Sequence, residues 1–458
     1  METHLKSDAI EIFLAGVAAV EPGRAVRSHL KLEGDDLLAD EHRFPLNPDG
    51  RVLVVGAGKA GAPMAAAVEE ILGQRIGEGL VVVKYGHLTP VKSVRILEAG
   101  HPVPDEAGVN ASERMCALLE GSTEQDLVIC LLSGGGSALL PCPVPSVTLE
   151  DKQAVTSLLL ECGAEIGEIN CIRKHLSRLK GGGLAKMAHP STVLTLILSD
   201  VVGDPLDVIA SGPTVGDPTN FSQALAVLER HKIREKAPDA VKNYLEAGAA
   251  GKYPETPKPG DPELAGVINL LVGTNAVAVQ AAEDAARALG YHTTVLSSTV
   301  TGETKEAAAA HAAVAREIVT TDQPQKRPAC VLSGGETTVT IKGAGKGGRN
   351  QEFALAAALS IQGLPGTFIL SAGTDGTDGP TDAAGAMADG TTVKRAKEAG
   401  MDASTHLDNN DAYPLFEKLG DLLMTGPTLT NVMDLRVMLV GERPDPRSKI
   451  QNPKNRAI

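Results

Sequence analysis

Aromatic side chains are almost absent from this sequence. It contains no tryptophan, and phenylalanine, tyrosine and tryptophan together make up 2% of the 458 residues. The hydrophobic cores must therefore be built from alanine, valine, leucine and isoleucine. Apolar residues make up 43% and charged residues 22%, as in an ordinary soluble globular protein. The length suggests two or three domains, each large enough for its own core.

Three further absences exclude whole classes of protein. The formal net charge is −14 without any long basic run, which argues against a nucleic-acid partner. The six cysteines show no Cys-x-x-Cys spacing, so they predict buried thiols in a reducing compartment and neither a disulfide framework nor a zinc site. No run approaches the roughly 20 apolar residues of a membrane span, and the first residues lack the basic region and cleavage site of a signal peptide. We therefore expect a cytoplasmic protein with no membrane partner.

Short apolar runs alternate with helical stretches along most of the chain. RVLVVG is followed by a glycine loop and the helical stretch APMAAAVEEILG, and then by the runs GLVVVKYG, VRILEAG and DLVICLLS. This order predicts a parallel sheet whose strands are buried on both faces. The pattern resumes after the proline-rich and charged segment GKYPETPKPGDPE, which is typical of a linker. Further along, CVLSGG and TTVTIKG are predicted to form a hairpin or adjacent strands.

We therefore predict an α/β protein with two three-layer α/β/α domains. The larger, over residues 45–250, is predicted to be Rossmann-like with a mostly parallel sheet, and the second covers residues 262–440. A helical lead-in over residues 1–44 is expected to pack on the second domain, and residues 441–458 form a polar tail. Ligands of open α/β sheets bind beyond the carboxyl ends of the strands. Four apolar runs end in Leu-Ser and then a loop of small or acidic residues, so we expect strand ends that face ligands, with the active site in the cleft between the domains.

The first candidate loop is the segment GAGKAG, which contains Gly56, Gly58 and Lys59 and matches the dinucleotide pattern G-x-G-x-x-G between a strand and a helix. The NAD interpretation requires an acid at the end of the next strand, where this sequence has Lys84. An NADP interpretation stays open, since Lys84 could meet a 2′-phosphate. A cation in the first helical turn opposes the helix dipole at a cost of about 0.3–1 kcal/mol. Lys59 is therefore interpreted as an anion-binding residue, with a solvated surface lysine as the alternative.

Two other glycine-rich segments could hold phosphate. The first, SGGGS, contains Ser133, Gly134, Gly135, Gly136 and Ser137; it predicts either an anion nest of backbone N–H groups or a simple tight turn.

The second, GAGKGGRNQE, precedes a helix and places Gly347, Gly348 and Arg349 at its start, which favours anion binding over a solvated loop. Lys180, in KHLSRLKGGG, is a weaker candidate of the same kind.

Acidic residues follow two of the Leu-Ser junctions. Asp200 and Asp204 come after LILS, and Asp375 and Asp378 come after FILS. Mg²⁺ typically takes one or two carboxylates together with phosphate oxygens and water, so these loops are candidates for metal binding or catalysis. Aspartate is also an ordinary turn residue, and that alternative stays open.

Many of these segments occur in the same order in one known family. GAGKAG, GHPVPDEAG, LLSGGGSALL, IRKHLSRLKGGG, LSDVVGDP, GGRNQE and SAGTDGTDGPTDAAGA together resemble the glycerate 2-kinases with a C-terminal MOFRL domain, here at about residues 328–440. The resemblance implies phosphorylation of D-glycerate to 2-phosphoglycerate, with ATP as co-substrate and Mg²⁺ or another divalent cation. The important lysine and arginine of the family match Lys59 and Arg349.

From the chemistry of phosphoryl transfer we assign Lys59 and Arg349 to charge neutralisation and Asp200 to accepting the proton of the substrate hydroxyl. Asp204, Asp375 and Asp378 are the candidate metal ligands. Two rival hypotheses remain, an NADP-dependent hydroxypyruvate reductase and a non-catalytic protein that binds phosphorylated metabolites. The sequence leaves open whether the protein is a monomer or a homo-oligomer.

Overall fold

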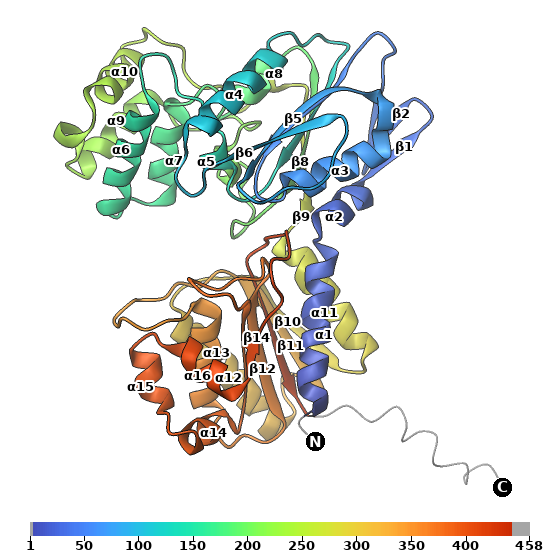
Figure 1. Cartoon of the computed structure of the whole chain (residues 1–458), viewed down its shortest axis with the longest axis vertical. Coiled ribbons are helices and arrows are strands. Elements are labelled where there is room, and N and C mark those ends of the chain that lie inside the picture. The colour runs from blue at the N-terminus through green and yellow to red at the C-terminus, as the bar shows by residue number, and fades with distance from the viewer. Residues whose placement is uncertain (1–2, 442–458) are drawn as a thin grey trace. The chain divides into compact units, whose positions relative to one another are not determined.

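The chain forms two compact units (Figure 1). The structure is a computed structural model that describes residues 3–441. We call Pro22–Gly273 the parallel-sheet unit, and residues 3–21 with 274–441 the mixed-sheet unit. The polar tail expected from the sequence lies, from residue 442 onward, outside the described residues. No helix within residues 3–441 combines the length and the apolar character needed to cross a membrane.

The expected lead-in over residues 1–44 is divided between the two units. Its first helix, α1 (Thr3–Ala19), belongs to the mixed-sheet unit. From Pro22 onward the chain belongs to the parallel-sheet unit, where α2 (Pro22–His29) packs against α3 (Gly61–Leu72). The boundary in the structure therefore differs from the one expected near residue 45, because the apolar face of α2 is covered by α3.

The parallel-sheet unit is built on a six-stranded sheet with the order β6-β5-β4-β7-β8-β9, and all of its neighbouring strands run parallel. Every residue of β4 and β7 is buried, as the continuous apolar runs predict. The strand order reverses between β4 and β7, so their carboxyl ends flank the point where α/β sheets bind ligands. The strands are β4 (Val52–Ala57), β5 (Ile76–Lys84), β6 (Val94–Ala99), β7 (Leu127–Leu132), β8 (Thr192–Leu198) and β9 (Val267–Gly273).

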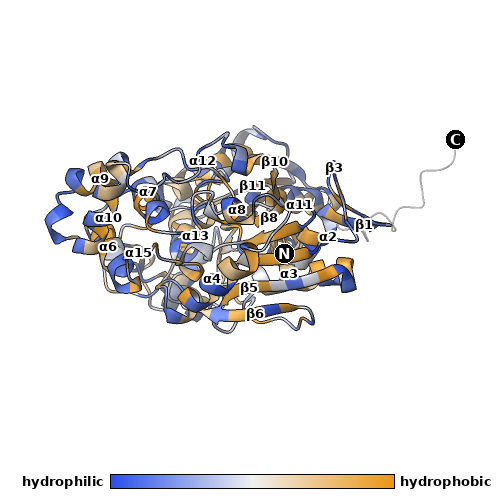
Figure 2. Cartoon of the chain, turned by 90° about the horizontal axis from the view of Figure 1, so that it is seen from above, coloured by the Kyte–Doolittle hydropathy of each residue, from blue (hydrophilic) through white to orange (hydrophobic). Residues whose placement is uncertain are grey.

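Helices cover both faces of this sheet, which confirms the three-layer prediction. Helix α3 contacts β4, β5 and β7, whereas α4 and α8 pack with Leu53, Val55 and Ala57 of β4 in a separate core cluster. A second cluster joins α6, α7, α9 and α10, which lie together in Figure 1. Figure 2 shows apolar residues along the strands and polar residues on the outer turns of helices such as α9. The helices are α4 (Glu106–Leu119), α5 (Gly136–Leu139), α6 (Leu149–Glu161), α7 (Ile166–His175), α8 (Gly183–Ala188), α9 (Phe221–Arg230) and α10 (Asp239–Ala249).

A small antiparallel sheet completes this unit. It has the order β1-β2-β3 and consists of β1 (Leu30–Glu33), β2 (Asp36–Ala39) and β3 (His42–Pro45). Strand β1 contacts both α2 and α3, so the small sheet extends the layer on that side.

The mixed-sheet unit contains a six-stranded sheet with the order β10-β11-β15-β12-β13-β14. Only β10 and β11 pair in parallel; the other neighbours pair antiparallel. The last strand within the described residues, β15, thus lies between β11 and β12, and it pairs with both along its whole length. The strands are β10 (His292–Val300), β11 (Ala329–Gly335), β12 (Thr367–Gly373), β13 (Gly385–Asp389), β14 (Leu422–Leu423) and β15 (Asp434–Val440).

Helices also cover both faces of the mixed sheet. Helix α1 lies along α11, as Figure 1 shows. Helix α1 packs on β12 and β15, and α11 packs on β10, β11 and β15, in one core cluster. Helices α12 and α13 form a second cluster on the opposite face, and α14, α15 and α16 surround α13. The helices are α11 (Asn275–Ala288), α12 (Thr304–Thr321), α13 (Arg349–Ser360), α14 (Thr392–Glu398), α15 (Ala403–Asp408) and α16 (Ala412–Leu419).

Two expectations are wrong in this unit. The segment TTVTIKG forms no strand; its Thr338 makes one isolated bridge, with Glu303. Because β15 already pairs with the free edge of β11, no edge is left for a hairpin partner. In addition, Ser333 and Ser371 of the Leu-Ser junctions lie inside β11 and β12 and are fully buried, so in this sheet the loops begin two residues later than expected.

Candidate active site

The turn between β4 and α3 brings Lys59 beside the second glycine loop. The Lys59 N–H donates to the carbonyl oxygen of Gly134 at 2.9 Å, and the Ala60 N–H donates to Ser133 Oγ at 3.0 Å. Gly58 adopts φ +145° at this turn, and a Cβ there would collide with Ser133. The two loops that follow β4 and β7 are therefore joined by hydrogen bonds, with the half-buried Lys59 side chain at their junction.

Asp200 lies at the same edge of the sheet, directly after β8 and Ser199. A Cβ on Gly134 would overlap the carboxylate of Asp200, so only glycine allows the loop and the acid to approach this closely. Strands β4, β7 and β8 are neighbours, and their carboxyl ends thus bring a cation, a glycine loop and a carboxylate together. This arrangement resembles other ligand sites at the reversal of strand order.

Two histidines border Lys59. His87 Nδ1 donates to the Lys59 carbonyl oxygen at 3.1 Å, and His101 lies beside Gly135, where an added Cβ would come within 2.9 Å of the imidazole and 3.5 Å of Lys59 Cγ. Burial, together with the charges of Lys59 and Lys84, lowers the pKa of His101 to about 4. His101 is therefore neutral near pH 7. Sequence reasoning missed both histidines, although the segments KYGH and GHPVP each follow a predicted strand.

Lys180 holds the SGGGS loop in place through hydrogen bonds to its backbone. Its ammonium group is buried and donates to the carbonyl oxygens of Ser137 (2.8 Å) and Leu140 (3.0 Å). Burial and the charge of Lys152 lower the pKa of Lys180 well below its usual value. Ser137 Oγ forms a 2.8 Å hydrogen bond with Ser211 Oγ, while Gly135 adopts φ +88° and Gly136 begins α5. In this structure Lys180 and Ser137 thus fix the shape of the loop.

Among the candidate metal ligands, Asp204 has the clearest capacity to bind. It lies in the loop after β8 with φ +54°, and its Oδ1 is buried without a hydrogen-bond partner in the described structure. An orphaned buried carboxylate oxygen is costly unless a ligand or ion satisfies it. The described residues contain no group of three or more histidine, cysteine, aspartate or glutamate residues arranged to hold a metal. Mg²⁺ needs fewer protein ligands than that when phosphate and water complete its shell.

Asp375 and Asp378 lie in the other unit. Asp375 Oδ1 accepts hydrogen bonds from the N–H and Oγ1 of Thr377. Asp378 is buried and its two oxygens accept the N–H groups of Asn350 (3.0 Å) and Gln351 (2.9 Å), which satisfies the first turn of α13. Burial raises the pKa of Asp378 to about 6, against the pull of these two amides. Asp378 therefore serves the helix terminus in this structure, and a metal-binding role for either acid stays a prediction.

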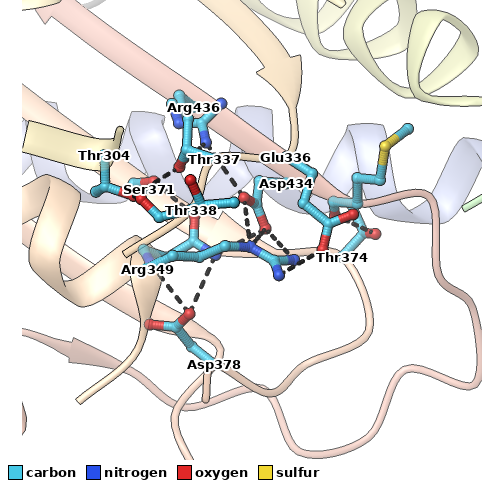
Figure 3. A network of polar contacts seen from close by, with 12 residues as sticks. Thr304, Glu336, Thr337, Thr338, Arg349, Ser371, Thr374, Asp378, Asp434 and Arg436 are labelled. Carbon is cyan, nitrogen blue, oxygen red and sulfur yellow. Dashed lines mark hydrogen bonds and ion pairs between the residues drawn. The ribbon is translucent and has the colours of Figure 1, made fainter. Parts of the chain in front are cut away.

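Arg349 is the first residue of α13 and is held by two acids (Figure 3). Its Nε donates to Asp434 Oδ2 at 2.8 Å and its Nη2 to Asp434 Oδ1 at 3.0 Å, while its Nη1 donates to Glu336 Oε1 at 2.6 Å. Burial disfavours the charge, but the carboxylate of Asp434 and then that of Glu336 raise the pKa of Arg349 above its usual value. Each terminal nitrogen carries a second N–H that these bonds do not use, so the cation is fixed in place and can still bind an anion.

Asp434 connects Arg349 to a buried polar layer that sequence reasoning missed. It is fully buried and also accepts from Asn350 Nδ2 (2.8 Å) and Arg436 Nη2 (3.2 Å). Arg436, 2% exposed, stacks over Phe353 with Cζ 4.9 Å from the ring centroid. The only signal in the sequence was an Asp and an Arg in the otherwise apolar run DLRVMLV.

A cavity of about 500 Å³ lies beside Arg349 in the mixed-sheet unit. Its lining includes the loop that precedes α13, with Gly347 and Gly348, and the segment after β11. Figure 3 shows Glu336, Thr337 and Thr338 of that segment close to Arg349. The cavity therefore joins the predicted anion-binding loop to a volume typical of small-molecule sites.

The structure thus groups the predicted residues into two sets. Lys59, Ser133, Gly134 and Asp200 come together in the parallel-sheet unit, and Gly347, Gly348 and Arg349 come together in the mixed-sheet unit. The expected cleft between domains, where both sets would act on one substrate, stays a prediction.

Comparison with known proteins identifies the family. A D-glycerate 2-kinase from Thermotoga maritima is 44% identical over 437 residues, which cover 95% of this chain and 98% of that protein. The chain belongs to the glycerate kinase family. A crystal structure of a glycerate kinase from T. maritima has a TM-score of 0.86 with 43% identity, and the match covers 95% of this chain and 99% of that one.

Two family descriptions match separate parts of the chain. "Domain of unknown function (DUF4147)" matches residues 8–246 and "MOFRL family" matches residues 329–434, which confirms the expected MOFRL segment. A protein from Agrobacterium vitis named putative hydroxypyruvate reductase is also similar, with 43% identity over 94% of this chain and 93% of its own.

Proposed function

We propose that this protein transfers the γ-phosphoryl group of ATP to the C2 hydroxyl of D-glycerate, giving 2-phosphoglycerate and ADP. The observation that carries the proposal is the meeting of Lys59, the Gly134 loop and Asp200 at the carboxyl ends of three neighbouring parallel strands. A cation, a glycine loop that can approach phosphate closely and a carboxylate are groups that such a transfer uses. The family to which the chain belongs supports the same activity.

The carboxylate of Asp200 is assigned to the substrate hydroxyl. As the C2 oxygen attacks the γ-phosphorus, its proton passes to Asp200, and the bond between the γ-phosphorus and the bridging oxygen breaks to release ADP. The ammonium group of Lys59 neutralises charge on the phosphoryl oxygens, and the hydrogen bond from the Lys59 N–H to Gly134 holds the backbone of this residue beside the glycine loop. Phosphoryl transfer depends mainly on such alignment and charge neutralisation.

We assign Arg349 to supply the second positive charge in the reaction, beside that of Lys59. Its guanidinium group is held by Asp434 and Glu336 and still has N–H groups that can donate to phosphate oxygens. The held guanidinium pays little entropy on binding, which favours arginine over lysine at this position. That Arg349 and Lys59 serve the same phosphoryl group is part of the proposal.

A divalent cation fits the acids of the parallel-sheet unit. Asp204, with its orphaned Oδ1, is the residue that would hold Mg²⁺. When bound, the cation would supply charge to the phosphate oxygens of the nucleotide.

The test measures two reactions on one preparation. Release of ADP is followed with D-glycerate, Mg²⁺ and ATP, and oxidation of NADPH is followed with hydroxypyruvate. The proposal expects ADP release that requires D-glycerate and no NADPH oxidation. Oxidation of NADPH without glycerate-dependent ADP release would instead support the reductase.

A further inference from the structure

The cavity beside Arg349 has a strongly apolar side. Val339, Ile341, Pro380 and Ala412 contribute to its wall, and Ile341 is 79% exposed, so its side chain is accessible to a ligand. A volume of about 500 Å³ exceeds what a three-carbon acid needs and lies in the range of larger organic ligands. The cavity therefore suits a ligand with an apolar part as well as an anionic end.

One oxygen of a buried carboxylate in the same cavity lacks a hydrogen bond. Glu352 is 3% exposed, and its Oε2 accepts from Asn410 Nδ2 at 2.9 Å. Its Oε1 is buried and has no hydrogen-bond partner in the part of the chain that the structure describes. The ammonium group of Lys305 lies 3.9 Å from it and donates instead to the Leu407 carbonyl oxygen at 3.1 Å. Because an unmet buried acceptor is costly, a ligand that donates to Oε1 gains affinity.

Arg349 and Glu352 stand three residues apart on α13, so they lie on the same side of the helix. Arg349 can bind an anion, whereas Glu352 Oε1 requires a hydrogen-bond donor. Phosphate and carboxylate groups carry no donor, but a nucleoside carries ribose hydroxyls and, in adenosine, an exocyclic amine.

We infer that this cavity binds the nucleoside part of the nucleotide co-substrate, with Glu352 Oε1 accepting a hydrogen bond from a nucleoside donor and the apolar wall contacting the base. The inference rests on the proposed function for the identity of the co-substrate. Glu352 is thus a specificity-determining residue, and the phosphates extend from the cavity toward Arg349, Gly347 and Gly348.

The test compares KM values for ATP and two analogues in the full-length protein. ITP lacks the exocyclic amine, and 2′,3′-dideoxy-ATP lacks both ribose hydroxyls. The analogue that lacks the donor bound by Glu352 Oε1 should have a KM about 10- to 100-fold above that of ATP. This is the range expected for the loss of a hydrogen bond to a charged group. Glu352→Ala should raise the KM for ATP by a similar factor, leave that analogue unaffected and leave the KM for glycerate unchanged.

Two further variants keep the test decisive. Ile341→Ala alters an exposed side chain and should therefore leave the fold intact, but it should raise the KM for ATP about 10-fold through lost apolar contact. Glu283→Ala is the matched control, because Glu283 is also a buried glutamate of the mixed-sheet unit, bound to Arg287 and outside the cavity lining. It should leave the KM for ATP unchanged even if it lowers stability.

Binding of the non-hydrolysable β,γ-imido analogue of ATP, measured by calorimetry without glycerate, separates this inference from the proposed function. Weaker binding in Glu352→Ala and Ile341→Ala supports the nucleoside site even if no glycerate is phosphorylated. Unchanged nucleotide KM and affinity in both variants, with normal phosphorylation in the wild type, would overturn the site and leave the kinase proposal standing.

Discussion

Replacing Asp434 by asparagine tests whether one buried acid organises the mixed-sheet site. In the wild type, four side-chain nitrogens donate to this carboxylate, two from Arg349 and one each from Asn350 and Arg436. An asparagine keeps the size but has a single acceptor oxygen, and its NH₂ group would face donors. The substitution therefore removes the negative charge that Arg349 and Arg436 share.

The magnitude follows from the burial of the partners. Arg436 is 2% exposed, and its Nε and Nη1 already lack hydrogen-bond partners in the described structure, so it cannot recover the lost interaction from water. Removing one partner of a buried ion pair typically costs about 3–5 kcal/mol. The Arg349 side chain is 33% exposed and is able to relax toward solvent and toward Glu336. We therefore expect the free energy of unfolding of the mixed-sheet unit to fall by about 3 kcal/mol, near the lower end of that range.

Hydrogen exchange resolved to β11, β12 and β15 measures this loss without requiring the whole chain to unfold in one step. Asp284→Asn is the matched control, since Asp284 belongs to the same unit, pairs with Arg287 and has a side chain that is 65% exposed. In this control variant we expect the free energy of unfolding to fall by about 1 kcal/mol or less. A loss below 1 kcal/mol in Asp434→Asn together with unchanged turnover would refute the organising role of Asp434.

Three further predictions concern single side chains. Lys59→Ala should lower kcat about 10³-fold with D-glycerate and ATP, as for other phosphoryl-clamping cations, and a near-wild-type rate would remove Lys59 from the mechanism. Gly134→Ala should lower kcat up to about 100-fold because the new methyl group displaces Asp200, whereas Gly121→Ala, which faces open space, should have no effect; equal rates for the two variants would contradict the geometry. Burial lowers the pKa of His311 to about 4, so its contribution to stability is complete above the unfolded pKa of about 6.5 and is lost as pH falls toward 4. Between pH 7 and pH 4 the wild type should lose about 3 kcal/mol more unfolding free energy than His311→Gln, measured by urea titration; parallel pH profiles would show that His311 is not the titrating group.

The elements of the parallel-sheet unit could be predicted because their signals are local. Strands such as β4 and β7 are buried on both faces and read as continuous apolar runs, and the glycine loops follow them directly. The hydrogen bond between Lys59 and Gly134 could be predicted once β4 and β7 are known to be neighbouring strands. The sequence does not state that order, but the rule that ligands bind at the carboxyl ends of strands selects the loops that lie side by side in the structure.

The mixed-sheet site could be predicted only in part, because its key contacts join residues far apart in the chain. Strand β15 inserts between β11 and β12, which places Asp434 next to Arg349, 85 residues earlier. Pairing at that distance leaves no local pattern, and the local pattern wrongly favours TTVTIKG as the partner of β11. Glu352 was missed for another reason: in sequence it is an ordinary helical glutamate, and its unmet oxygen depends on the side chains packed around it.

The identity of the product tests the central claim most directly. The protein is incubated with D-glycerate, Mg²⁺ and ATP, and the phosphorylated product is identified by ³¹P and ¹³C NMR. The account predicts 2-phosphoglycerate, formed in equal amount with ADP. A product phosphorylated at C3, or ATP left intact in the presence of D-glycerate, would contradict it.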